Sequence, residues 1–222
     1  MTRAEVRARI AEIGIIPAVR VYSESEAMFA AEAISGSGVP IVEVTMTTPG
    51  ALDVMAQLTR YSTDIVVGAG TLTDVDTARR CLDAGAGFLT SPGLDLEIVE
   101  FALKRDVAVL PGALTPSEVM AAWKAGADFV KVFPCSANGG PDYIRALKAP
   151  FPHIPQIASG GVTQKNPADF ILAGAAALGI GQHLIHQNAI KRRQRERIHE
   201  LARRYMGMVG DARSQSAAAS GS

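Results

Sequence analysis

The chain has 222 residues, with 22 Lys plus Arg and 22 Asp plus Glu, so its formal net charge is zero. This balance argues against a generally basic nucleic-acid binder and against an acidic disordered chain. Aromatic residues make up only 5%, which predicts an aliphatic, alanine-rich core of the kind found where helices cover a parallel sheet.

Eight short apolar runs alternate with longer amphipathic segments from one end of the chain to the other. Strands that alternate with helices predict right-handed crossovers and a parallel sheet. Eight such units in about 200 residues favour a single-domain (β/α)8 TIM barrel, with a doubly wound open sheet as the competing architecture. The predicted strands are Ile15–Val21, Pro40–Thr45, Asp64–Gly68, Gly87–Ser91, Val107–Leu110, Asp128–Phe133, Pro155–Ala158 and Ala177–Ile180.

A repeated Ala-Gly-Ala motif supports the barrel. It occurs at residues 84–86, 125–127 and 173–175, and Ser37-Gly38-Val39 takes the same place earlier. We expect each glycine to end a helix in the left-handed conformation and to lead into a strand. The barrel domain is predicted to span residues 1–213, and the Ser/Ala/Gly/Gln-only segment 214–222 is predicted to be a disordered tail or an added remnant.

The cysteines and the hydropathy pattern bear on the compartment. Cys81 and Cys135 are too few for a disulfide framework or a zinc site, and they suit a reducing environment. The longest charge-free run, Phe170–Ile190, is interrupted by glycines, histidines and amides, so it does not predict a membrane span. We therefore expect a cytoplasmic chain with no membrane and no nucleic-acid partner.

Two charged residues occur inside otherwise apolar strands. Alternation in the strand around Lys131 places the flanking valines on one face and the lysine on the other, and the same holds for Glu43. Valines suit the helix-covered outside, so both charges are predicted to point inward. Their strands are the second and the sixth, which face each other across an eight-stranded barrel. We expect the two side chains to meet near the axis, with a structural ion pair as the alternative interpretation.

This pair predicts a specific chemistry. Burial disfavours the charged form of a lysine, and a neutral amine can attack a ketone to form a Schiff base. A nearby Glu43 is placed to carry protons during that reaction. The protonated imine is itself the electron sink, so no metal and no other cofactor is predicted. His183 and His186 have no third ligand near them in the sequence and are assigned to a surface turn or a subunit contact.

Glycines and hydroxyls at the strand ends predict an anion site. Phosphate in barrels is often bound by the loops after the seventh and eighth strands. Both loops are glycine-rich in this chain, and Thr71 at another strand end is placed to bind a carboxylate or hydroxyl. The predicted phosphate ligands are Ser159, Gly160, Gly161, Gly181 and Gln182.

Taken in order, these motifs resemble the 2-keto-3-deoxy-6-phosphogluconate (KDPG) aldolases, a family that includes the 4-hydroxy-2-oxoglutarate (KHG) aldolases. The motifs are Glu43-Val44-Thr45, Gly68-Ala69-Gly70-Thr71, Ser91-Pro92-Gly93, Pro111-Gly112, Phe129-Val130-Lys131-Val132-Phe133-Pro134 and Gly160-Gly161. The resemblance covers residues 10–205. It implies a class I aldolase, usually a homotrimer, that reversibly cleaves a phosphorylated 2-keto acid to pyruvate and glyceraldehyde 3-phosphate.

The resemblance also implies roles for single residues. Lys131 matches the Schiff-base lysine, Glu43 the general acid and base, and Phe133 the aromatic residue beside the imine. Pro92 matches a position in the substrate site.

The chain departs from the family pattern in three motifs. Thr47 stands where many members have an arginine that holds the substrate carboxylate, and Arg20 at the end of the first strand is expected to supply that charge. Ala158-Ser159 replaces a usual Pro-Thr, and Gln182 replaces a common serine. Two alternatives stay open: another phosphate-binding barrel with isomerase or synthase activity, and a trimeric barrel used as an assembly scaffold.

Overall fold

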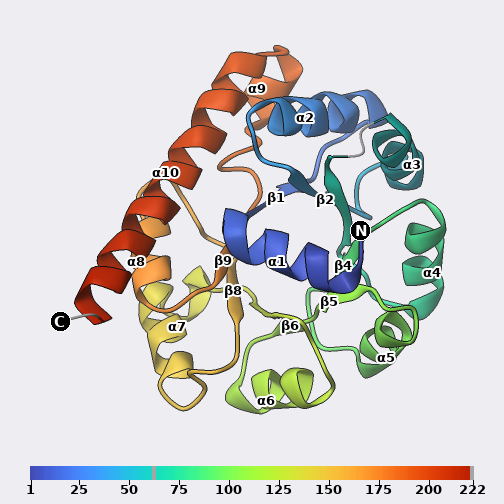
Figure 1. The fold of residues 1–222 in the computed structure, drawn as a ribbon. Helices are drawn as coiled ribbons and strands as arrows, with labels where there is room; N and C mark the ends of the chain where they lie inside the picture. The colour runs from blue at the N-terminus through green and yellow to red at the C-terminus, as the bar shows by residue number, and fades with distance from the viewer. Residues whose placement is uncertain (62–63, 221–222) are drawn as a thin grey trace.

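The computed structural model describes residues 1–61 and 64–220 as a ring of parallel strands surrounded by helices (Figure 1). The strands are β1 (Ile15–Val19), β2 (Ile41–Thr45), β3 (Val66–Gly70), β4 (Phe88–Thr90), β5 (Ala108–Leu110), β6 (Gly112–Ala113), β7 (Val130–Val132), β8 (Gln156–Ser159) and β9 (Ala177–Ile180). The helices are α1 (Arg3–Ile13), α2 (Glu24–Gly36), α3 (Ala51–Tyr61), α4 (Val75–Asp83), α5 (Leu96–Lys104), α6 (Pro116–Lys124), α7 (Pro141–Lys148), α8 (Pro167–Leu172), α9 (Gln187–Lys191) and α10 (Arg195–Ser220), with a 3-10 turn η1 at Ser136–Asn138.

The fifth barrel strand is broken into two pieces, β5 and β6. The hydrogen-bonded order runs β5-β4-β3-β2-β1-β9-β8-β7-β6, so these two consecutive pieces join the ends of the sheet. Between them lies Pro111, which has no N–H to donate to a ladder, although its carbonyl still accepts the Lys131 N–H at 2.9 Å. The sheet is therefore a closed (β/α)8 barrel, as predicted, and the open-sheet alternative is wrong.

The predicted glycine rhythm is confirmed at the helix ends. Gly38, Gly85, Gly126 and Gly174 all have positive φ, between 92° and 103°. An L residue with a side chain rarely adopts this conformation, so these positions require glycine.

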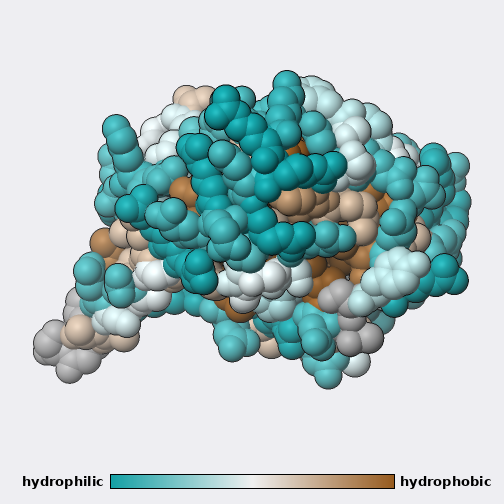
Figure 2. Space-filling view, turned by 90° about the horizontal axis from the view of Figure 1, so that it is seen from above, coloured by the Kyte–Doolittle hydropathy of each residue, from teal (hydrophilic) through white to brown (hydrophobic). Residues whose placement is uncertain are grey.

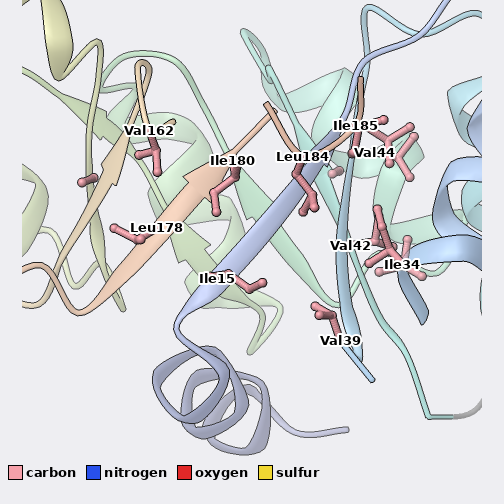
Figure 3. Packing of buried hydrophobic residues seen from close by; sticks show 14 of the residues in the cluster. Ile15, Ile34, Val39, Val42, Val44, Val162, Leu178, Ile180, Leu184 and Ile185 are labelled. Atoms are coloured by element: carbon pink, nitrogen blue, oxygen red, sulfur yellow. The ribbon is translucent and has the colours of Figure 1, made fainter. Parts of the chain in front are cut away.

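Valines on β2 and β7 face the helices, as the alternation predicted. Val42, Val44, Val130 and Val132 are all buried in the cluster between strands and helices. Figure 3 shows Val42 of β2 beside Ile34 of α2. Outside this layer the helices present polar faces, and the side of the molecule seen in Figure 2 is mainly hydrophilic with hydrophobic atoms visible between. Along residues 1–61 and 64–220, no helix combines the length and the hydropathy that crossing a bilayer requires.

Helix α1 closes the N-terminal end of the barrel (Figure 1). Thr2 and Glu5 form a capping box at its start, and Val6 and Ile10, 1% and 0% exposed, face the barrel interior. There they join an inner apolar layer made of Ile16, Ile41, Val66, Phe88, Ala108, Leu110, Phe129, Ile157 and Ala177. The start of α1 is fastened by Arg3, whose Nε lies 3.0 Å from Asp128 Oδ1. None of the predicted elements includes this helix.

The C-terminal segment differs from its prediction. Residues 214–220 continue α10 as helix instead of forming a disordered tail, and residues 221–222 lie outside the described part. Alanine is the best helix former, and adding residues to an existing helix avoids the cost of nucleation. The body of α10 is fixed by Arg213, which donates to the carbonyls of Ala11, Glu12 and Ala176 at 2.6–2.9 Å.

Candidate active site

Lys131 of β7 and Glu43 of β2 meet inside the barrel, which confirms the predicted juxtaposition. Lys131 Nζ lies 3.7 Å from Glu43 Oε2, and the two side chains are 13% and 6% exposed. This separation exceeds a normal hydrogen bond, so the groups attract each other while both keep room for a third partner. Gly70 makes the arrangement possible, because a Cβ at that position would lie 2.0 Å from Glu43 Oε1.

The surroundings of the Lys131 amine are apolar on two sides. Phe129, directly before β7 and two residues before Lys131, belongs to the inner layer that α1 closes. Phe133, two residues later, places its ring centroid 5.9 Å from Lys131 Nζ. The amine therefore stands between an apolar floor and an open space above it.

That space is a cavity of about 890 Å³ at the carboxyl ends of the strands. All twelve residues predicted for the site line it: Arg20, Glu43, Thr47, Thr71, Pro92, Lys131, Phe133, Ser159, Gly160, Gly161, Gly181 and Gln182. The sequence motifs, which are scattered over more than 160 residues, therefore converge on one cavity.

A polar group forms the wall beside the ends of β1, β2 and β3. Arg20 Nη2 donates to Thr71 Oγ1 at 3.2 Å, so the arginine reaches across the rim. Thr71 has a φ of 63°, a left-handed conformation that is uncommon for threonine. Thr47 Oγ1 lies 2.9 Å from the buried Thr45 Oγ1. The cation on this side of the cavity thus comes from Arg20, while Thr47 offers a hydroxyl.

The loop after β8 is held in one conformation by its glycines and by Asn166. Gly160 and Gly161 have φ values of 80° and 94°, and a Cβ on Gly161 would lie 2.1 Å from Ser136 Oγ. Asn166 holds the loop by donating to the Gly161 carbonyl at 3.1 Å. Within the described ranges, the N–H groups of Gly160, Gly161 and Val162 donate to no protein acceptor. Backbone N–H groups fixed in this way can bind a phosphate.

The cavity lining also includes ten residues that the sequence did not assign to the site, among them the polar side chains of Tyr22, His183 and Gln187. Tyr22 is 76% exposed at the rim. His183 lies in an exposed turn, as predicted, and it also lines the cavity directly after Gln182. In the sequence, Tyr22 and His183 stand only one or two residues beyond an assigned site residue, whereas Gln187 stands five residues beyond Gln182.

The cysteines lie outside the cavity lining. Both are buried, and burial raises the pKa of the Cys81 and Cys135 thiols to about 11. A thiol that stays protonated is a poor nucleophile, so neither is suited to covalent chemistry. Over residues 1–61 and 64–220, no three His, Cys, Asp or Glu side chains gather as a metal-binding group.

Comparison with known proteins agrees with the site. The family described as "Aldolase: KDPG and KHG aldolase" matches residues 6–201. A relative from Pseudomonas aeruginosa, a 2-dehydro-3-deoxy-phosphogluconate aldolase, is 30% identical over 192 residues, which is 86% of this chain and 87% of that protein.

Two solved structures share the fold. KDPG aldolase from Legionella pneumophila, with pyruvate captured as a covalent carbinolamine intermediate, has a TM-score of 0.82 and 30% identity, covering 88% of this chain and 95% of that one. A cube-shaped protein cage designed by fusing symmetric oligomeric domains has a TM-score of 0.84 and 29% identity, covering 94% of this chain and 76% of that one. The chain therefore belongs to the KDPG and KHG aldolase family, and it is a carbon–carbon lyase of the class I, Schiff-base type.

Proposed function

We propose that this chain reversibly cleaves 2-keto-3-deoxy-6-phosphogluconate, or a related 2-keto-4-hydroxy acid, to pyruvate and an aldehyde. For the phosphorylated substrate the aldehyde is glyceraldehyde 3-phosphate. The observation that carries the proposal is the Lys131–Glu43 pair, held 3.7 Å apart at the floor of a cavity large enough for a sugar acid.

The reaction begins at the Lys131 amine. Its nitrogen attacks the C2 carbonyl and forms a carbinolamine, and loss of water then gives the protonated imine. Glu43 is near enough to supply a proton to the departing hydroxyl. Phe133 packs beside the new C=N bond and limits the access of water from that side.

Cleavage follows from the positive imine. Glu43, as carboxylate, takes the proton of the C4 hydroxyl, and the C3–C4 bond breaks as the aldehyde forms. The electron pair of that bond moves to the imine nitrogen, which leaves an enamine on Lys131. Protonation at C3 and addition of water to the imine release pyruvate and restore the amine, so atoms and electrons balance without any outside oxidant or reductant.

The remaining cavity residues hold the two ends of the substrate. Arg20 and Thr71 bind the substrate carboxylate, which many family members hold with an arginine at the position of Thr47. The Thr47 hydroxyl forms a hydrogen bond with a substrate oxygen. Pro92 packs against the pyruvate portion. The distal phosphate is bound by the N–H groups and side chains of the two glycine-rich loops, Ser159, Gly160, Gly161, Gly181 and Gln182.

Borohydride trapping tests the chemistry. Reduction in the presence of pyruvate should leave a stable adduct on the peptide that contains Lys131, measured by mass spectrometry, and borohydride alone should leave none. An unmodified Lys131 peptide after treatment would contradict the Schiff-base assignment.

The substrate is tested by comparing kcat/KM for phosphorylated and unphosphorylated 2-keto-3-deoxy acids and for 4-hydroxy-2-oxoglutarate. A strong preference for the phosphorylated acid supports the phosphate site. Equal kcat/KM values for the phosphorylated and unphosphorylated acids would mean that the glycine-rich loops do not bind phosphate. The Schiff-base chemistry of Lys131 would be unaffected by that result.

Assembly and compartment are part of the same proposal. We place the enzyme in the cytoplasm as a homotrimer, a state supported by the family resemblance and by the likeness to a domain of a cage built from symmetric oligomers. The two free thiols suit a reducing compartment. Light scattering in solution would measure three times the 23.3 kDa chain mass if the trimer is right. Larger assemblies would favour the scaffold alternative.

A further inference from the structure

The loop of residues 181–187, here called the distal loop, leads into the short helix α9. Hydrogen bonds at both ends of α9 attach it to the start of α2. On one side, Gln187 Nε2 donates to Glu26 Oε2 at 3.4 Å. On the other, Arg193 Nη1 donates to the Ser25 carbonyl at 3.0 Å. Because Gln187, together with Gln182 and His183, lines the cavity, these two ties hold part of the cavity wall. Figure 1 shows α9 lying against α2 at the top of the view.

Arg193 makes more than one contact at this point. Its Nη2 also lies 3.4 Å from Ser25 Oγ, and its guanidinium carbon lies 4.9 Å from the centroid of the Phe29 ring. Its φ is 52°, a left-handed conformation at the junction where α9 ends and α10 begins. A residue with a side chain keeps such a conformation where surrounding contacts impose it. Here the end of α9 imposes it, because the Arg193 N–H donates to the Ile190 carbonyl and the Gln194 N–H donates to the Ala189 carbonyl. From this position the exposed Arg193 side chain makes its contacts with Ser25 and Phe29.

The same first turn of α2 also supports the neighbouring segment of the rim, after β1. Glu26 Oε2 accepts the Tyr22 N–H at 3.0 Å in addition to the Gln187 amide. Tyr22 lines the cavity from the loop after β1. The start of α2 is therefore a common support for two segments of the rim, and Arg193 is the cation that fixes α9 to it.

We propose that Arg193 is a positioning residue that sets the affinity of the enzyme for the distal end of its substrate without touching it. It does so by fixing α9 on the start of α2, which holds the distal loop in the geometry that receives the phosphate. This inference rests on the proposed function, because only there is the distal loop assigned to phosphate. Small displacements of binding groups are costly for rate and affinity, so a contact outside the cavity can matter.

Three variants test the proposal by steady-state kinetics. Arg193→Ala removes the contacts with Ser25 and Phe29 and keeps the strained backbone. Arg193→Gly removes the same contacts but accepts the left-handed φ, so it still tests the proposal if the alanine variant folds poorly. Arg195→Ala is the matched control, because Arg195 also lies over Phe29, at 5.7 Å, and pairs with Glu32, yet makes no bond to Ser25.

Both Arg193 variants should raise KM for the phosphorylated substrate by about tenfold and change kcat by less than about twofold. Arg195→Ala should leave both constants unchanged. Borohydride trapping at a half-saturating pyruvate concentration should be the same in all variants, because pyruvate is too short to reach the distal loop. An unchanged KM, or an equal loss of pyruvate trapping, would overturn the proposal.

Amide hydrogen exchange of the peptide 181–190 gives a readout that does not depend on the substrate. Exchange should be faster in Arg193→Ala and Arg193→Gly than in the unmodified chain or in Arg195→Ala. Identical exchange in all four would overturn the positioning role. If the unmodified chain fails to trap pyruvate, the proposed function falls, while the exchange experiment still decides whether Arg193 holds the loop.

Discussion

The two ends of the barrel are filled in opposite ways. At the N-terminal end, Val6 and Ile10 of α1 close an apolar layer of inward side chains. At the C-terminal end, a lysine and a glutamate occupy the equivalent inward positions under an open cavity. The change from apolar to charged takes place between successive inward positions of the chain, since Phe129 and Lys131 are only two residues apart.

This contrast shows how a single barrel separates stability from chemistry. The closed end removes apolar surface from water and keeps water from reaching the reactive amine from below. The open end carries charged groups that contribute little net stability, as is usual for a buried ion pair. Changes at the open end should therefore alter activity more than stability, and changes at the closed end should do the reverse.

Lys131→Arg is the most damaging change expected at the open end. Arginine keeps the positive charge beside Glu43, but a guanidinium stays protonated and cannot form the imine. We expect aldol cleavage, followed by pyruvate production, to fall by at least about 10⁴-fold. Thermal unfolding of the variant should stay close to that of the unmodified chain. Near-complete activity would instead favour an isomerase or synthase that uses the cavity without a Schiff base.

Glu43→Gln should separate imine formation from proton transfer. The amide has the same shape as the carboxyl group but cannot accept and return a proton, so we expect cleavage to fall by about 10²- to 10⁴-fold. Trapping of pyruvate on Lys131 should persist at a reduced rate. Exchange of the pyruvate methyl protons with deuterated water, followed by NMR, should be lost. Exchange at the normal rate would assign the proton transfer to another group.

The same contrast explains what the sequence could and could not predict. Strand alternation with a period of two is a local pattern, so the inward positions of Glu43 and Lys131 could be read directly. Helix α1 could not be predicted in this way, because its inner face consists of little more than Val6 and Ile10 among charged residues. Its burial depends on the whole ring of strands that it closes.

The missed cavity residues have a similar cause. Tyr22 and His183 lie on loops whose paths depend on tertiary contacts, such as the bonds from Tyr22 and Gln187 to Glu26. The strand β6 was missed because it contains only Gly112 and Ala113, too short a segment to show an alternating pattern. Residues 214–220 extend the helix α10. The low complexity of this segment led instead to the prediction of a disordered tail.

Ile10→Ala tests the closed end. This side chain is fully buried, and its removal should leave a cavity under the inner layer, so we expect the free energy of unfolding to fall by about 2–5 kcal/mol. Denaturant unfolding measures the change. The partly buried Ile13→Ala should cost less and serves as the comparison. Activity per folded molecule should stay close to normal at low temperature, and a large loss of kcat with little loss of stability would contradict the separation of the two ends.

Gly161→Ala should have the smallest effect, limited to the phosphate end of the cavity. The added Cβ meets Ser136, and the φ of 94° is strained for alanine, so the loop must shift. We expect KM for the phosphorylated substrate to rise by about tenfold, with kcat/KM for an unphosphorylated 2-keto-3-deoxy acid nearly unchanged.

Two further variants separate the causes of that rise. Gly38→Ala introduces an alanine at a similar positive φ with no atom within 4 Å of its Cβ, far along the chain from the phosphate loop, so it should lower stability without changing KM. Adding Ser136→Gly to Gly161→Ala removes Ser136 Oγ and Cβ, which would lie 2.1 and 2.2 Å from the new Cβ, and should restore part of the affinity. If Gly38→Ala raised KM as much as Gly161→Ala, the lower affinity would result from general strain in the fold. The assignment of phosphate binding to the loop after β8 would then be wrong.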